Sequence, residues 1–218
     1  RQYRFGIAVT TRLPGVGALC PFVSEHGAVA VQSHASDWLG ERILSYLADG
    51  LAIEDAVDAL LAADDNRRNR QVHGVDADGS VVFTGRECVG YADHRSRGQF
   101  TVAGNLLTDE SVLDATAAAY ESDAFGEAPL AERLIDALAA GLEAGGDKRE
   151  SLSVGSAALK VVSTEETAYR RFYNDLRVDA SETPVDDLRT TYEAALLGYE
   201  QSLDEYADPA EVDSLRPE

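Results

Sequence analysis

The 218-residue sequence contains no methionine, one tryptophan and two cysteines, Cys20 and Cys88. Two cysteines cannot build a multi-disulfide framework, and they lack the CxxC spacing of a zinc site, so they suit a reducing cytoplasm. No apolar run approaches the roughly 18 residues that a membrane-spanning helix needs. The polar opening is not a secretory signal. We therefore expect a cytoplasmic protein.

Lysine is also scarce, since Lys148 and Lys160 are the only two, and 19 basic residues face 39 acidic ones for a net charge of -20. Such a surface repels phosphate backbones and anionic lipid, so neither a nucleic acid nor a membrane is an expected partner. Arginine in place of lysine, with abundant Asp and Ala, indicates adaptation to molar salt of the haloarchaeal type. There the Debye length is only about 3 Å and acidic self-repulsion is screened. The alternative is an ordinary acidic mesophilic protein.

Motifs for phosphate and metal binding are missing: there is no GxxxxGK[ST], no HExxH and no paired CxxC, and the four histidines are scattered. We expect no cofactor and no metal. Gly15-Val-Gly17 alone is interpreted as a turn before a strand. Cys20, in an apolar run, is expected to pack as a small hydrophobic residue.

Hydrophobic periodicity groups the predicted strands and helices instead of alternating them, which favours an α+β layered fold over a doubly wound parallel sheet. We expect a single domain over residues 1–203, with two stacked, mainly antiparallel sheets flanked by helices, and an acidic C-terminal tail over residues 204–218. Helices are predicted to begin near Ser36, Ile53, Asp109, Pro129 and Pro184, and strands are predicted at Phe5–Thr11, Val16–Phe22, Ala28–Val31, Gln71–Val75, Ser80–Thr84, Gln99–Ala103, Ser156–Val162 and Phe172–Val178.

The segment Ser33-His34-Ala35-Ser36 lies where a buried strand leads into a helix N-terminus. Unpaired N–H groups and the positive end of the helix dipole can hold a developing oxyanion there. His34 is a candidate to orient a substrate or relay a proton. The alternative is a capping turn with a solvated histidine.

Two further segments carry candidate chemistry. Asn105, at a strand end before a helix, can fix a substrate amide, or it can belong to an ordinary turn. Asp147, in Gly145-Gly-Asp-Lys-Arg149, is a candidate to hold a catalytic amine within an internal ion pair, against the alternative of a solvated turn. Asp93-His94 is a weak candidate for a dyad, because adjacent side chains seldom point together.

Several segments, in their order along the chain, resemble the family catalogued as domain of unknown function 1028. The resemblance runs from about Phe5 to about Leu196. That family is placed in the N-terminal-nucleophile (Ntn) hydrolase superfamily, so the resemblance implies a four-layer αββα sandwich. The segments that carry it include Phe5-Gly-Ile-Ala-Val9, Gly27-Ala-Val-Ala-Val-Gln-Ser33, Ala103-Gly-Asn105, Gly145-Gly-Asp-Lys-Arg149 and Asp175-Leu-Arg-Val-Asp179.

The resemblance also implies a mechanism, in which the first residue of the mature chain, Thr, Ser or Cys, attacks an amide carbonyl. Its own α-amino group, with a reference pKa near 8, is the base. Arg1 has no nucleophilic side chain, and family members open with a strand that is absent here, so we expect the nucleophile upstream of Arg1. The lysine found beside the nucleophile of proteasome subunits has no counterpart, which favours an amidase-like variant that uses only the amine.

By position in the fold, the resemblance implies that the backbone of Ser33, His34 and Ala35 contributes to the oxyanion hole. It places Thr10 or Thr11 near the missing strand, with Thr11 as the catalytic candidate, and Asn105 and Asp147 at the site. The leading hypothesis is an amidohydrolase that acts on a small amide or peptide-like compound and assembles as a homo-oligomer. The alternatives are a non-catalytic binding or assembly module that retains the sandwich and, less favoured, a metal-dependent hydrolase using His34.

Overall fold

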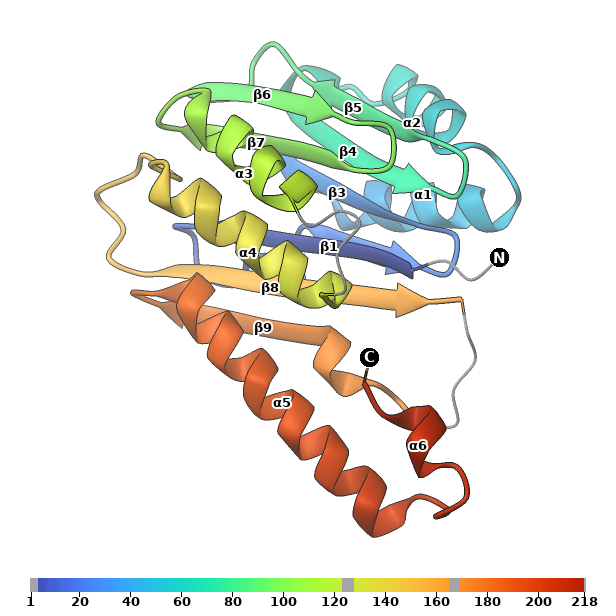
Figure 1. The fold of residues 1–218 in the computed structure, drawn as a ribbon. Helices are drawn as coiled ribbons and strands as arrows, with labels where there is room; N and C mark the ends of the chain where they lie inside the picture. Colours follow the sequence, from blue (N-terminus) through green and yellow to red (C-terminus); the bar gives the residue numbers. More distant parts are fainter. Residues whose placement is uncertain (1–3, 123–127, 165–168, 218) are drawn as a thin grey trace.

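A computed structural model describes residues 4–122, 128–164 and 169–217 (Figure 1). The first of its sheets is antiparallel and has the strand order β1-β8-β9. Strand β1 (Arg4–Thr11) pairs with β8 (Gly155–Ser163), which pairs in turn with β9 (Asp175–Ser181). Strand β1 therefore lies at the edge of this sheet. Apart from β8, no strand of the described residues pairs with it.

The second antiparallel sheet has the order β2-β3-β4-β5, and a separate hairpin of β6 and β7 lies against β4 and β5. The Asp76-Ala-Asp-Gly79 turn between β4 and β5 is closed by the Asp76 carboxylate, which accepts hydrogen bonds from the N–H groups of Asp78 and Gly79. The strands are β2 (Pro21–Ser24), β3 (Gly27–Ser33), β4 (Arg70–Asp76), β5 (Ser80–Thr84), β6 (Tyr91–Ser96) and β7 (Thr101–Leu107).

The two larger sheets share a hydrophobic core, and small residues in it shorten the distance between the sheets. On β1, Phe5, Ile7 and Val9 alternate with less buried residues, as a strand with one covered face should. They pack against Ala28, Ala30 and Ala158, so alanines of β3 and β8 let the sheets approach closely.

Helices cover the outer faces of both sheets. Helices α1 (Asp37–Ala48) and α2 (Ile53–Ala62) bury an apolar face on the β2-β3-β4-β5 sheet. Helices α4 (Leu130–Glu143) and α5 (Pro184–Tyr206) lie against the β1-β8-β9 sheet, and α3 (Ser111–Ser122) lies beside α4 and the β6–β7 hairpin. As predicted, Ser36 caps α1, and its Oγ accepts a hydrogen bond from the N–H of Leu39 at 3.3 Å.

The C-terminal segment continues this packing. Helix α5 extends to Tyr206, and the chain then folds back through α6 (Val212–Leu215). Leu203 and Leu215 are buried in the core beneath α5, and the Tyr199 hydroxyl donates to the carbonyl of Leu215. The acidic tail predicted over residues 204–218 is therefore attached to the domain across its described part.

The α+β class and the antiparallel sheets are confirmed. The strands predicted at Val16–Phe22, Gln99–Ala103 and Phe172–Val178 begin two or more residues later in the structure. The segment Val16–Phe22 is a 3₁₀ turn, η1 (Val16–Ala18), followed by β2, because Gly15 takes a left-handed φ of 79°. Strand β6 was not predicted at all. Asn105 lies inside β7 and not at its end.

The segment predicted as a strand over Phe172–Val178 also begins as a 3₁₀ turn, η3 (Phe172–Asn174), before β9. A third such turn, η2 (Arg67–Asn69), leads into β4. None of the helices in the described residues combines the length and apolarity needed to cross a membrane.

Truncation of the α1 core contact is expected to destabilise the protein. Ile43 is fully buried beneath the helix, so Ile43→Ala should lower the free energy of unfolding by about 2–5 kcal/mol. Trp38 on the same helix is 64% exposed, and Trp38→Ala should change it by no more than about 0.5 kcal/mol. Urea unfolding followed by circular dichroism measures both; equal losses would contradict the assigned helix face.

Candidate active site

A cavity of about 1920 Å³ lies between β1, β7, α3 and α4. All of β1, from Arg4 to Thr11, contributes to its wall, together with the end of β3 and the loop that leads into β8. Figure 1 shows β1 between β3 and β8, with α4 running in front of it. The cavity therefore follows the strand whose second edge has no partner strand among the described residues.

Asp147 organises one end of this cavity. Its carboxylate accepts hydrogen bonds from the Thr11 hydroxyl at 3.1 Å and from the Arg12 N–H at 3.1 Å. Arg149 binds the same carboxylate through its backbone N–H, its Nε and its Nη2, the last forming an ion pair. Arg149 Nη2 also donates to the Thr11 hydroxyl at 2.6 Å. This Asp147 cluster, made of Thr11, Arg12, Asp147 and Arg149, joins the end of β1 to the loop before β8.

The Asp147 carboxylate is only 12% exposed. Burial by itself raises its pKa, but the hydrogen bonds from Arg149 and from the Arg12 N–H outweigh burial and hold the pKa below its usual range. The same ion pair favours the charged form of Arg149 and raises its pKa. The predicted internal ion pair is present. It leaves the carboxylate saturated by protein donors, so Asp147 positions Arg149 and β1 and has no lone pair left to hold an amine.

A buried amide network organises the wall formed by β3, β4 and β7. The Gln71 side chain is completely buried, and its Nε2 lies at 2.9–3.1 Å from the Thr84 hydroxyl and from the carbonyls of Asp93 and Gly104. These bonds attach the β6–β7 hairpin to the second sheet. They satisfy the donor side of an amide that would otherwise be costly to bury.

The acceptor side of the same amide faces Asn105. Gln71 Oε1 accepts from Asn105 Nδ2 at 3.2 Å and from Gln32 Nε2 at 3.1 Å. Asn105 is therefore oriented by a fully buried partner and lines the cavity. With Nδ2 held by Gln71, Asn105 can present its Oδ1 and its second N–H to a substrate amide.

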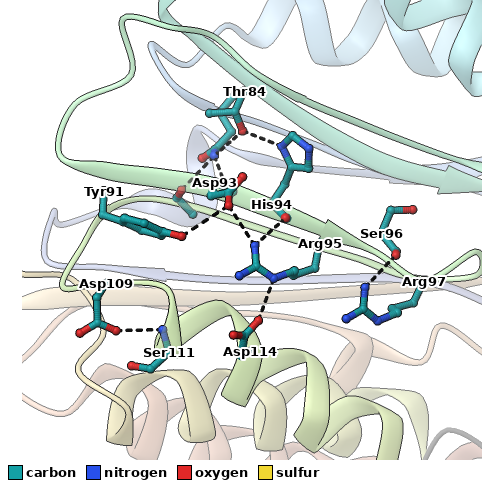
Figure 2. A network of polar contacts seen from close by, with 12 residues as sticks. Thr84, Tyr91, Asp93, His94, Arg95, Ser96, Arg97, Asp109, Ser111 and Asp114 are labelled. Atoms are coloured by element: carbon teal, nitrogen blue, oxygen red, sulfur yellow. Dashed lines mark hydrogen bonds and ion pairs between the residues drawn. The ribbon is translucent and has the colours of Figure 1, made fainter.

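Asp93 and His94 point to opposite sides of β6 and do not form a dyad, as Figure 2 shows. The Asp93 carboxylate binds Arg95, which also binds Asp114 of α3 at 2.7 Å. His94 Nδ1 lies 2.9 Å from the Thr84 hydroxyl. Both residues hold the hairpin in place.

The turn after β3 has a strained backbone. Ser33 has a φ of 66° and Leu106 a φ of 56°; they are the non-glycine residues with positive φ in the described part of the chain. Both line the cavity. Such conformations cost of order 1–3 kcal/mol and cluster at functional sites. The strain therefore marks the same cavity.

His34 lies outside this cavity, in contrast to Ser33 and Ala35. Its backbone N–H donates to the carbonyl of Asn69 at 3.1 Å. The buried Arg70 guanidinium binds the carbonyls of His34 and Ala35 and pairs with Asp64 at 2.7 Å. The His34 N–H is therefore occupied, and the oxyanion donors predicted for this turn are reduced to Ser33 and Ala35.

Of the residues predicted as a site, Thr11, Ser33, Ala35, Asn105 and Asp147 line one cavity, and His34 does not. Sequence reasoning did not single out three neighbours that the structure adds: Gln71, Gln32 and Arg149. The sequence places Gln71 on a predicted strand and Gln32 directly after one, but it does not show which group each side-chain amide binds. Arg149, two residues from Asp147, was noted only as part of a possible ion pair.

Two groups of the cavity are unsuited to nucleophilic or metal chemistry. Burial raises the pKa of the Cys20 thiol to about 12, so it stays protonated. Burial, with a smaller contribution from nearby His94, lowers the pKa of His73 to about 4. No group of three or more His, Cys, Asp or Glu side chains in the described residues is arranged to hold a metal ion.

The Asp147 cluster makes stability depend on pH. Because the native pKa of Asp147 is lowered relative to an unfolded value of about 3.9, its contribution is present above about pH 4 and is lost as the pH falls through the native pKa. Asp147→Asn should lower the free energy of unfolding by about 1.5–3 kcal/mol at neutral pH, and the difference should shrink below pH 4. Urea titrations at several pH values test this, with exposed Asp65→Asn as the control that should show no such gap.

Loss of the Gln71 amide should loosen the hairpin. Gln71→Leu leaves Asn105, Gln32 and two backbone carbonyls without their partner, at about 1–3 kcal/mol for each buried group left unpaired. Amide hydrogen exchange of β6 and β7 should accelerate well above that of β3. The exposed Gln99→Leu is the matched control. Unchanged hairpin protection would show that the amide network does not fasten it.

No match is found among curated proteins. A crystal structure of protein SPO2555 from Silicibacter pomeroyi, of the DUF1028 family, is similar with a TM-score of 0.72 and 28% identity, over 87% of this chain and 79% of that chain. The profile described as "Family of unknown function (DUF1028)" matches residues 1–188. The chain therefore belongs to the DUF1028 family.

Proposed function

We propose that this protein is an amidohydrolase of the Ntn type, which cleaves the C–N bond of a small amide or peptide-like substrate in the cavity beside β1. The observation that carries the proposal is the position of β1 as the outer strand of the β1-β8-β9 sheet in the described part of the chain. This strand runs along the cavity and ends at the Asp147 cluster, where Asn105 and the Ser33–Ala35 turn also line the wall. The two stacked antiparallel sheets with helices on their outer faces suit the αββα sandwich of that superfamily.

The hydroxyl and thiol groups near β1 do not supply an activated nucleophile. The Thr11 hydroxyl donates to Asp147 and accepts from Arg149, and the Thr10 hydroxyl donates to the carbonyl of Ser156. The Cys20 thiol is held protonated. We propose instead that the nucleophile is a Thr, Ser or Cys that precedes Arg1, on an extended segment that lies beside β1.

In this mechanism the terminal residue attacks the substrate carbonyl carbon and its proton passes to the α-amine. The C–N bond then breaks, the leaving amine takes that proton, and water hydrolyses the acyl-enzyme to a carboxylic acid. Asn105, oriented by Gln71, fixes the substrate amide, and the Ser33–Ala35 backbone faces the developing oxyanion. Asp147 keeps Arg149 and the end of β1 in place.

The proposal predicts the N-terminus of the mature protein. Intact mass and N-terminal sequencing of protein from its native source should find Thr, Ser or Cys as the first residue. A β-lactone probe should acylate that residue, as mapped by peptide mass spectrometry. Replacement of it by Ala should abolish labelling, whereas Cys88→Ala should not alter it. A mature protein that begins at Arg1, or labelling elsewhere, contradicts the mechanism.

The second candidate function is a binding or assembly module that retains this fold without the nucleophile. The saturated Asp147 carboxylate favours this second function, because a carboxylate whose hydrogen bonds all come from the protein stabilises the fold. The same labelling experiment separates the two functions. A module without catalytic chemistry would bind amide ligands in the cavity and remain unmodified by the probe.

A further inference from the structure

The cavity has a second polar end, formed by α3, α4 and the turn between β6 and β7. The Arg133 guanidinium carbon lies 4.4 Å from the centre of the Tyr120 ring, and that ring lies 4.7 Å from the centre of Phe100. All three residues line the cavity. We call them the Arg133 cluster.

Arg133 combines a buried Nε that has no hydrogen-bond partner with a place on the cavity wall. The chain has 39 acidic and 19 basic residues, yet Arg133 forms no ion pair within residues 4–122, 128–164 and 169–217. Its Nε is buried and has no hydrogen-bond partner among them. The carboxylate of Glu121, which follows Tyr120, pairs with Arg97 at 3.4 Å and not with Arg133. Arg133 is half-buried, and with a buried Nε and no ion-pair partner among the described residues its guanidinium is available to bind an anionic group of a ligand.

The cavity wall is also less acidic than the rest of the protein. Its lining contains five arginines and five acidic residues, in a chain whose net charge is -20. Asp147 and Glu121 are paired with arginines, and Asp76 accepts backbone N–H bonds in its turn. The remaining acids, Asp78 and Glu182, are exposed at the surface. An anion that is repelled elsewhere therefore meets its least unfavourable surroundings here.

The two polar ends lie at opposite ends of β1. A side chain at Gly6 would approach Leu134 to 2.8 Å, so the first turns of α4, which carry Arg133, lie over the start of the strand. The Asp147 cluster holds Thr11, five residues further along. At about 3.4 Å per residue, Gly6 and Thr11 are about 17 Å apart along β1.

We propose that Arg133, supported by Tyr120, binds a carboxylate group of a ligand that occupies this cavity. The planar guanidinium matches a carboxylate with paired hydrogen bonds, and the rings of Tyr120 and Phe100 offer an apolar surface beside it. This inference rests on the proposed function for the rest of the ligand: a stretch of about 17 Å along β1 between Gly6 and Thr11 suits an extended, peptide-like amide with a distal carboxylate.

Binding of a matched pair of peptides tests the carboxylate site without requiring turnover. The probes are N-acetyl-tetra-alanine with a free C-terminal carboxylate and the same peptide as its C-terminal amide, measured by isothermal titration calorimetry. The unmodified protein should bind the acid at least about tenfold more tightly than the amide. Arg133→Gln should remove this preference and leave binding of the amide unchanged.

Arg171 provides the matched control, because its Nε is also buried without a partner but it does not line this cavity. Arg171→Gln should keep the preference for the acid. Arg133→Lys keeps the charge and lets the Arg133 Nε–Hε NMR signal be assigned, and that signal should shift when the acid is added. Equal affinity for the two peptides in the unmodified protein, or equal effects of Arg133→Gln and Arg171→Gln, overturns the proposal. The binding measurements do not require the nucleophile. If the catalytic mechanism fails, the preference for the acid over the amide can therefore still be observed.

Discussion

The attachment of β1 to the loop before β8 through Asp147 is the constraint on which the cavity depends. One carboxylate receives hydrogen bonds from the Thr11 hydroxyl, the Arg12 N–H and three donor atoms of Arg149. The backbone of Asp147 also forms a β-bridge with Leu107 at the end of β7. The same residue thus fixes the distance between the first sheet and the hairpin, which form two walls of the cavity.

The buried Gln71 amide stabilises the opposite wall of the cavity through its hydrogen bonds. The cores on the outer faces of the two sheets are apolar and continuous, but the contact between β4 and the β6–β7 hairpin depends on Gln71 and its partners. Buried amides are directional, so they specify one register of the hairpin where apolar side chains would tolerate several. The cavity is therefore framed by hydrogen bonds, and its shape is set by a few long-range pairs.

The sequence predicted well the elements whose signals are local. The Ser36 cap and the apolar spacing of α1 depend on neighbours within a few residues. Strand β6 escaped detection because its residues are half-buried or exposed on both faces, so its polar sequence lacks alternation. Its pairing with β7 is a tertiary effect that overrides weak local preference.

The site was predictable in composition and only partly in geometry. Asp147 and Asn105 were singled out for their residue types, and they line the same cavity. His34 lies outside it because Arg70, distant in sequence, binds the carbonyls of this turn, while Asn69 accepts its N–H. No periodicity could reveal such a contact. The partner of each buried amide depends in the same way on how distant strands come together.

The position of β1 as the outer strand of its sheet in the described residues has a consequence for aggregation. An exposed strand edge ordinarily offers a template on which other molecules add their own strands and aggregate. Here β1 runs along a cavity whose wall also includes residues of α3 and α4, so the strand is recessed and does not lie flat on the surface. A single narrow segment can still enter. The same recess that admits an extended chain thus protects a protein with an open sheet from uncontrolled growth of that sheet.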